Sequence, residues 1–105
     1  MTLQSHEDLQ KLRAIGAIVR LSLEAMAKAA RPGMTTAELD AVCAATLDAH
    51  GAEPSPAKVY AFPGTACISV NEEAVHGIPG ERRLADGDLV KCDVTAEKDG
   101  YVAED

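Results

Sequence analysis

Apolar side chains recur at intervals of three and four residues along the first part of the chain, between mostly polar neighbours. This spacing is typical of a helix that buries one face. Ser5 is a suitable N-cap, and Glu7 and Asp8 would complement the helix dipole in the first turn. The pattern therefore predicts a helix from Ser5 to near Arg31. Its periodic apolar positions are Leu9, Leu12, Ile15, Val19, Leu23 and Met26.

A second helix is predicted after the break at Pro32 and Gly33. Thr35 and Glu38 have the spacing of a capping box, in which each side chain binds the backbone N–H of the other residue. Gly51 is placed to end this helix, since glycine readily adopts the left-handed conformation of a helix C-terminus. The expected inner face consists of Leu39, Val42, Cys43, Thr46 and Leu47.

Beyond Gly51 the pattern changes to short strands separated by loops rich in proline and glycine. We expect strands at 67–70, 89–96 and 101–105. Asp99-Gly100 is a strong signal for a two-residue hairpin turn between the last two. Two helices followed by antiparallel strands indicate an α+β arrangement with the helices packed on the sheet. The length of 105 residues fits one compact domain or a piece of one.

The formal net charge of -7 argues against nucleic acid or an anionic membrane as a partner, because both attract basic surfaces. The three cysteines form no CxxC pair, so neither a disulfide framework nor a structural zinc site is indicated. No apolar run has the length of a membrane span, and the polar N-terminus is unlike a signal peptide. We therefore expect a soluble, cytoplasmic protein with reduced thiols.

Candidate chemistry lies in the C-terminal hairpin. A turn at Asp99-Gly100 would pair Thr95 with Glu104, and alternation along the strands would place Asp93 and Glu104 on one face, about 7–8 Å apart at the backbone. Paired carboxylates suit divalent cations. Asp105 would point to the other face, unless a bulge shifted the register by one residue. The same acidic pattern is also common on solvated edge hairpins, so spacing alone leaves both interpretations open.

His76 is the second candidate, because nearby Gly77 relaxes the backbone and Pro79 restricts it, so that the ring could be held in a defined direction. Its imidazole could bind a substrate or transfer protons near neutral pH. An exposed or structural histidine fits the pattern as well. A nucleophilic pair of Cys67 and His76 is less favoured, since no orienting acid can be assigned.

A long stretch of the sequence resembles the type I methionine aminopeptidases. The resemblance is carried by FPGTACISVNEEAVHGIP at 62–79, by Leu84, by GDLV at 87–90, DVT at 93–95 and DGY at 99–101, and upstream by RPGMTT at 31–36 and ELD at 38–40. It implies the N-terminal half of a pita-bread fold, in which two α/β halves surround two divalent metal ions (Co, Mn, Fe or Zn). It also implies removal of the initiator methionine from peptides and nascent chains.

The resemblance assigns roles to particular residues. Asp93 matches a metal-ligating aspartate, and His76 matches a histidine that contacts the substrate at the scissile bond. Phe62 and Cys67 match positions that line the methionine pocket. The second metal-binding aspartate falls at Glu104, which leaves either Glu104 or the adjacent Asp105 as the second ligand.

The family's remaining ligands, a histidine and two glutamates, belong to a second half that this sequence does not include. We therefore expect the isolated chain to be inactive, with a complementing second half or self-association as expected partners. The alternative is a non-catalytic half-domain that acts as a protein interaction module. A related peptidase of the same fold, such as a proline dipeptidase, is less favoured by the match around His76.

Overall fold

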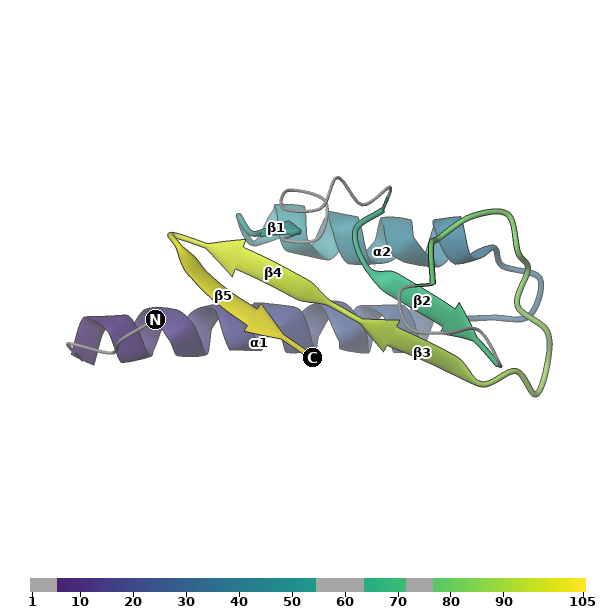
Figure 1. Cartoon of the computed structure of the whole chain (residues 1–105), viewed down its shortest axis with the longest axis horizontal. Helices are drawn as coiled ribbons and strands as arrows, with labels where there is room; N and C mark the ends of the chain where they lie inside the picture. The colour runs from purple at the N-terminus through teal and green to yellow at the C-terminus, as the bar shows by residue number, and fades with distance from the viewer. Residues whose placement is uncertain (1–5, 55–63, 72–76) are drawn as a thin grey trace.

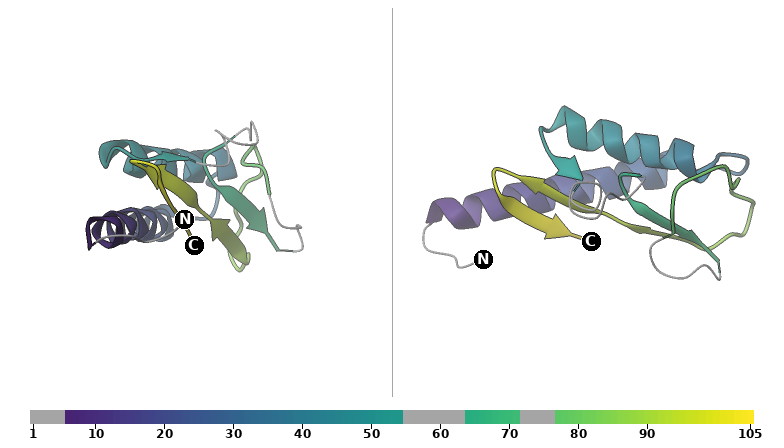
Figure 2. Two further views of the ribbon diagram at one scale, coloured as in Figure 1. Left: turned by 60° about the vertical axis from the view of Figure 1, so that its left-hand side comes forward. Right: turned by 45° about the horizontal axis from the view of Figure 1, so that its top comes forward.

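The structure of the chain, a computed structural model, describes residues 6–54, 64–71 and 77–105. Two helices come first, α1 (His6–Ala29) and α2 (Thr36–Ala49). Five short strands follow within the described residues: β1 (Glu53–Pro54), β2 (Cys67–Val70), β3 (Val90–Asp93), β4 (Thr95–Lys98) and β5 (Tyr101–Glu104). Both helices lie on the same side of the strands (Figures 1 and 2). The expected α+β arrangement, with two helices on an antiparallel sheet, is confirmed.

The first helix buries the face that the periodicity predicts. Its buried side chains are Ile15, Ile18, Val19, Ser22 and Met26, while Leu12 and Leu23 are partly buried beside them. Ser22 satisfies its buried hydroxyl by donating to the Val19 carbonyl at 2.7 Å. The helix ends at Ala29, slightly before the expected Arg31.

The second helix has the predicted caps at both ends. Glu38 N donates to Thr35 Oγ1 at 3.1 Å and Thr35 N donates to Glu38 Oε1 at 3.0 Å, which completes the capping box. At the other end Gly51 has a φ of 71°, and its N–H donates to the Asp48 carbonyl. Ala52 N donates to the Leu47 carbonyl at 2.9 Å, so the two bonds form a Schellman motif.

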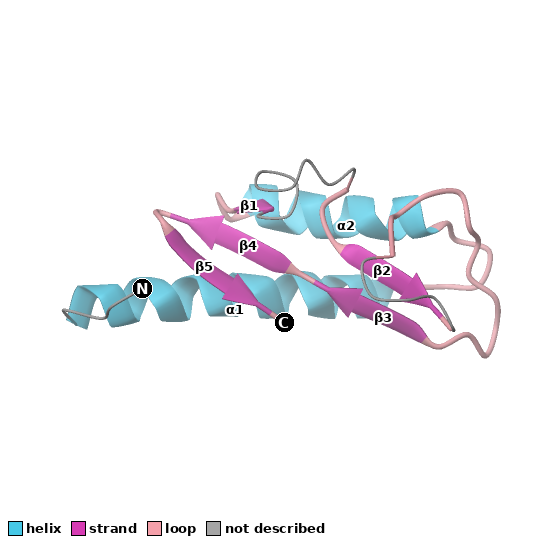
Figure 3. Cartoon of the chain, in the orientation of Figure 1, coloured by secondary structure: helices cyan, strands magenta, loops and turns pink. Residues whose placement is uncertain are grey.

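The predicted strand at 89–96 is two strands, and that prediction was wrong in its boundaries (Figure 3). β3 pairs with β2, whereas β4 pairs with β5 and, on its other side, with β1, a strand that the sequence did not predict. The exchange of partners occurs at Val94, whose N–H and C=O bond to Asp105 instead of to β2. One extended run from Val90 to Lys98 thus joins a two-stranded and a three-stranded sheet.

The core lies between the helices and the strands. α1 packs against α2, β4 and β5, and fully buried Val94 and Ala96 point from the strands toward the helices. The largest buried side chains are Ile15, Met26, Leu39, Leu47, Ile68, Val19, Val70 and Val94. Neither described helix is both long and apolar enough to cross a membrane.

Candidate functional site

The C-terminal hairpin has the predicted register. Thr95 lies opposite Glu104 and Lys98 lies opposite Tyr101. The turn residues Asp99 and Gly100 have φ values of 54° and 83°, as a type I′ turn requires. Pairing continues without a bulge to Val94 and Asp105, which exchange two backbone hydrogen bonds of 2.8 and 2.9 Å. The register shift that would have exchanged the faces of Glu104 and Asp105 is therefore excluded.

Asp93 and Glu104 lie on the same face of the sheet, the one that points away from the helices. Exposure alternates along the run that contains Asp93, with Val94 and Ala96 buried against the helices and Asp93 exposed. On β5, Ala103 packs toward the core, whereas Glu104 is exposed. Because paired residues share a face, Glu104 lies beside Thr95 and diagonally from Asp93. Asp105 is paired with Val94 and therefore lies on the opposite face.

Cys67 joins the two carboxylates on this face. It is the partner of Asp93 in the β2–β3 ladder, and its side chain is 7% exposed. Burial raises the pKa of the Cys67 thiol, and the negative charges of Asp93, Asp40 and Glu104 raise this pKa further. A thiol held in its neutral form is a weak nucleophile. The surroundings of Cys67 thus suit a wall residue and disfavour thiolate attack.

The described residues provide part of a cation site. Within residues 6–54, 64–71 and 77–105, no group of three or more His, Cys, Asp or Glu side chains could hold a metal ion. Asp93 and Glu104 supply two carboxylates, which are the oxygen donors that hard and borderline divalent cations accept. Neither carboxylate forms an ion pair with a lysine or arginine of the described segments. This donor set fits a divalent cation that takes its other ligands from elsewhere.

The segment after His76 is bound closely to β2. Ile68 N donates to the Gly77 carbonyl at 2.9 Å, and Gly77 N donates to Ser69 Oγ at 3.2 Å. A Cβ atom at Gly77 would lie 2.3 Å from the Ile68 carbonyl oxygen, so only glycine fits. His76 and Phe62 themselves lie outside the described residues, and their predicted roles stay predictions.

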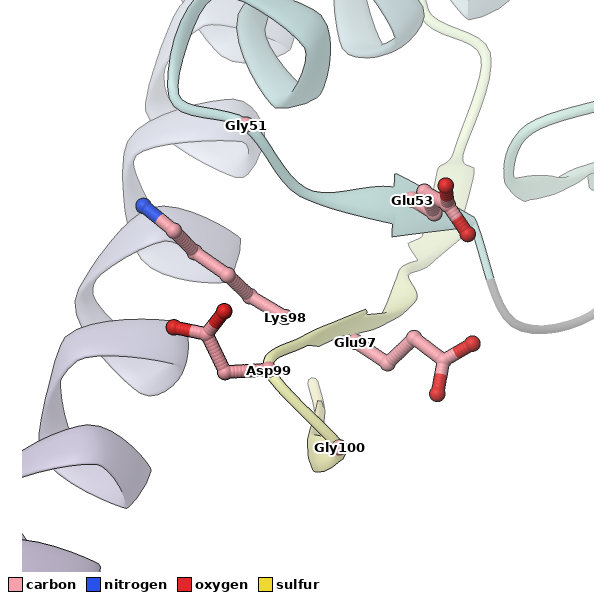
Figure 4. Close-up of a pocket in the computed structure, with 6 residues that line it drawn as sticks. All are labelled: Gly51, Glu53, Glu97, Lys98, Asp99 and Gly100. Atoms are coloured by element: carbon pink, nitrogen blue, oxygen red, sulfur yellow. The ribbon is translucent and has the colours of Figure 1, made fainter.

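A second acidic cluster lies at the turn end of the hairpin (Figure 4). A shallow hollow of about 250 Å³ is lined there by Glu53, Glu97, Asp99, Lys98 and two glycines. Glu53 and Glu97 are directly paired across β1 and β4. Lys98 points away from both and donates to the His50 carbonyl at 2.8 Å. This hollow is at the opposite end of β4 from Asp93.

Sequence reasoning missed two polar residues on the inner side of α2. Thr36, which is 3% exposed, bonds to the backbone of Gly80, and Asp40 accepts hydrogen bonds from the backbone N–H groups of Thr65 and Ala66. A signal was present in the sequence, because Thr36 and Asp40 are in line with the buried positions Leu39 and Cys43. Polar residues on a buried face require partners.

The sequence that forms this fold and this candidate site matches a known protein family. The sequence pattern of metallopeptidase family M24 matches residues 10–104, nearly the whole chain. The chain therefore belongs to the M24 metallopeptidases.

Within this family the chain is similar to methionine aminopeptidases. It is 46% identical over 104 residues to the methionine aminopeptidase of Staphylococcus epidermidis, covering 99% of this chain and 41% of that protein. It is also 46% identical over 105 residues to methionine aminopeptidase 2 of Bacillus subtilis, covering 99% and 42%. The resemblance seen in the sequence is confirmed.

Solved structures agree with this assignment. The methionine aminopeptidase of Rickettsia prowazekii superposes with a TM-score of 0.91 at 32% identity, covering 99% of this chain and 42% of that one. The enzyme of Thermotoga maritima gives 0.92 at 25% identity, with the same coverage. The fold is thus part of the pita-bread fold, and the chain spans about two-fifths of the length of these relatives.

Proposed function

We propose that this chain forms one wall of a methionine aminopeptidase active site, which removes the initiator methionine from nascent polypeptides in the cytoplasm. The observation that carries the proposal is the arrangement of Asp93, Glu104 and Cys67 on one face of the sheet. Because the chain is 46% identical to a methionine aminopeptidase, we interpret this arrangement as part of such an active site.

In this proposal Asp93 and Glu104 hold divalent cations (Co, Mn, Fe or Zn). When bound, such ions act as Lewis acids on the scissile carbonyl and activate water. The two carboxylates would hold such ions and neutralise part of their positive charge. Glu104 reaches farther than the aspartate found at this position in the family, and its flexible stem supplies the adjustment. Asp105, on the opposite face beside Val94, is the less suitable second ligand.

The methionine side chain would lie against Cys67 and Phe62. Cys67 is nearly buried and its thiol is held neutral, so it offers an apolar surface to a thioether side chain. His76 would donate a hydrogen bond to the substrate beside the scissile bond. Gly77, the next residue in the chain, has its backbone hydrogen-bonded to β2. These bonds fix the position of the chain directly after His76.

We further propose that the isolated chain does not turn over substrate. Two carboxylates bind a divalent cation weakly compared with a complete ligand set. A substrate held against one wall also lacks the orientation that catalysis requires.

The test is an assay on a Met-Ala peptide with added Co²⁺ or Mn²⁺. We expect no turnover by the chain alone and measurable turnover when the part of the Bacillus subtilis relative that this chain does not match is supplied in trans. Asp93→Asn should abolish that turnover, while Asp99→Asn in the hairpin turn should retain it. Turnover by the chain alone that Asp93→Asn removes would contradict the proposed inactivity. Failure of the wild-type pair to react, despite forming a complex, would refute the proposed function.

A protein interaction module is the second candidate, favoured by the exposure of apolar side chains near the sheet edge. Val102 on β5 is 45% exposed and Leu89 before β3 is 60% exposed. Within the described residues β5 pairs with β4 alone, so its outer edge can accept another strand. Sizing under native conditions tests this candidate, because a monomer at all concentrations would argue against self-association through this edge.

A further inference from the structure

One face of α2 carries two polar side chains that bind two different loop segments. Thr36 and Asp40 are four residues apart, so they lie one above the other on the helix surface. Leu39 and Cys43, which are 1% and 0% exposed, anchor this part of the helix in the core. The backbone that carries the Thr36 and Asp40 side chains is therefore held firmly by the core.

Asp40 binds the segment that leads into β2. Its carboxylate accepts from Thr65 N at 2.9 Å and from Ala66 N at 2.7 Å. Ala66 is fully buried, and Cys67 follows it directly as the first residue of β2. The negative charge of Asp40 also contributes to the raised pKa of the Cys67 thiol.

Thr36 binds the segment that follows His76. Its hydroxyl accepts from Gly80 N at 2.8 Å and donates to the Gly80 carbonyl at 3.3 Å. The same carbonyl accepts from Ala37 N at 2.9 Å, and Thr36 N donates to the Arg82 carbonyl at 2.9 Å. Since Gly77 is bound to β2, the residues from Gly77 to Gly80 are fixed at both ends.

The two bound segments are those that carry the expected substrate contacts. Thr65 and Ala66 lie between Phe62 and Cys67 in the chain, and Gly77 to Gly80 follow His76 directly. We propose that Thr36 and Asp40 are positioning residues, which align residues 65–66 before Cys67 and residues 77–80 after His76 from one face of α2. This inference rests on the proposed function, from which the two segments take their expected role in substrate binding. The hydrogen bonds themselves do not depend on any metal or substrate.

Hydrogen exchange of individual amides, measured by NMR on the metal-free chain, tests the geometry. Asp40→Asn should accelerate exchange at Thr65 and Ala66 by roughly ten-fold or more, because it removes charge-assisted bonds, while Gly80 stays unchanged. Thr36→Val should accelerate exchange at Gly80 by about five-fold, since the lost bonds are neutral. Thr36→Ser keeps the hydroxyl and should restore the wild-type rate.

Matched controls are available on the same helix. Asp48 is exposed, and the hydroxyl of Thr46 binds the Val42 carbonyl of its own helix at 3.0 Å. Asp48→Asn and Thr46→Val should leave exchange at Ala66 and Gly80 unchanged. Equal acceleration throughout the chain in both test variants would show that they only destabilise the fold. Unchanged exchange at the named amides would overturn the inference directly.

The trans-complementation assay distinguishes the two roles. Asp40→Asn should raise KM more than it lowers kcat, because it loosens the pocket wall. Thr36→Val should lower kcat with little change in KM, and Thr36→Ser should restore it. If Asp40→Asn and Thr36→Val instead had the same effect on kcat and the same effect on KM, the two distinct positioning roles would be wrong. Absence of turnover by a wild-type pair that forms a complex would refute the proposed function, while the exchange measurements would still decide whether the two side chains hold their segments.

Discussion

The two ends of the β4–β5 hairpin both gather carboxylates, and their surroundings differ. At the turn end, polar side chains tie the hairpin to the helices: Lys98 donates to the His50 carbonyl, and the Tyr101 hydroxyl donates to Asp8 on α1. At the open end, Asp93 and Glu104 lie beside a nearly buried neutral thiol and form no ion pair with any described lysine or arginine. A count of acidic residues would not single out the open end, because Glu53, Glu97 and Asp99 gather at the turn end. The neighbouring groups distinguish the anchoring cluster at the turn end from the candidate site at the open end.

The largest expected effect separates the two ends by cation binding. Mn²⁺ should broaden the NMR signals of Cys67, Asp93 and Glu104 before those of the hairpin turn, because the ion is paramagnetic and the proposed cation site is at the open end. Asp93→Asn removes a direct ligand of the proposed site. It should therefore weaken this binding by at least the roughly 10- to 100-fold that loss of a residue supporting a metal ligand commonly costs. Glu97→Gln should leave the affinity unchanged. Broadening centred on Glu53 and Glu97 would reverse the assignment of the two ends.

The second effect concerns the packing of the open end. Gly77→Ala would place a Cβ 2.3 Å from the Ile68 carbonyl oxygen and 2.8 Å from Ser69 Oγ, so the segment must move away from β2. We expect a loss of about 1–3 kcal/mol of unfolding free energy, as for other overpacking substitutions. Denaturant unfolding measures it. Gly16→Ala on α1 is the matched control: nothing lies within 4 Å of its added methyl, and it should stabilise the helix by about 0.5–1 kcal/mol. Equal stability of the Gly77→Ala variant and the wild type would show that the loop is not held against β2.

The same comparison shows how far the sequence predicts the structure. The helices, their caps and the hairpin register follow from local signals: the apolar period, the spacing of Thr35 and Glu38, and Asp99-Gly100. Because alternation along paired strands is regular, the shared face of Asp93 and Glu104 followed from that register. The short strand β1 and the exchange of partners at Val94 were not predicted, since they depend on segments distant in the chain that carry no local signal.

The candidate site was predictable in part for the same reason. Cys67 lies beside Asp93 only because β2 pairs with β3, and their alignment depends on tertiary packing and not on a turn. The hydrogen bonds of Thr36 and Asp40 to the loops also join residues that are far apart in the sequence, and one of them joins positions separated by 44 residues. The periodicity of a single helix does not predict such contacts. Local patterns thus identified the candidate side chains of the site, while the contacts of Thr36 and Asp40 with the two loop segments became visible only in the fold.

A smaller effect tests the anchoring of the turn end through pH. The hydrogen bond from the Tyr101 hydroxyl to Asp8 raises the pKa of Tyr101 above its ordinary value of 10.0, with burial and the charge of Asp8 acting in the same direction. A group whose pKa is raised on folding stabilises the protein fully below its unfolded pKa and ceases to do so as the pH rises through its folded pKa. The wild type should therefore lose more stability than Tyr101→Phe as the pH rises above about 10. Thermal unfolding across that range measures the difference. Parallel curves for the two proteins would show that the phenol does not anchor the hairpin to α1.

The smallest effect distinguishes a solvated acidic face from an ion site at the turn end. Glu53 and Glu97 are directly opposite in the β1–β4 ladder, where like charges repel. Glu97→Gln removes that repulsion and keeps the side-chain shape, so it should stabilise the fold by roughly 0.2–1 kcal/mol at low salt and by less at high salt. Glu24→Gln, at an exposed position of α1, controls for the change in net charge. If the hollow between the two glutamates held a cation, Glu97→Gln would instead destabilise the protein in the presence of Mn²⁺. Such a result would make the turn end the ion-binding end and remove the distinction between the two carboxylate clusters.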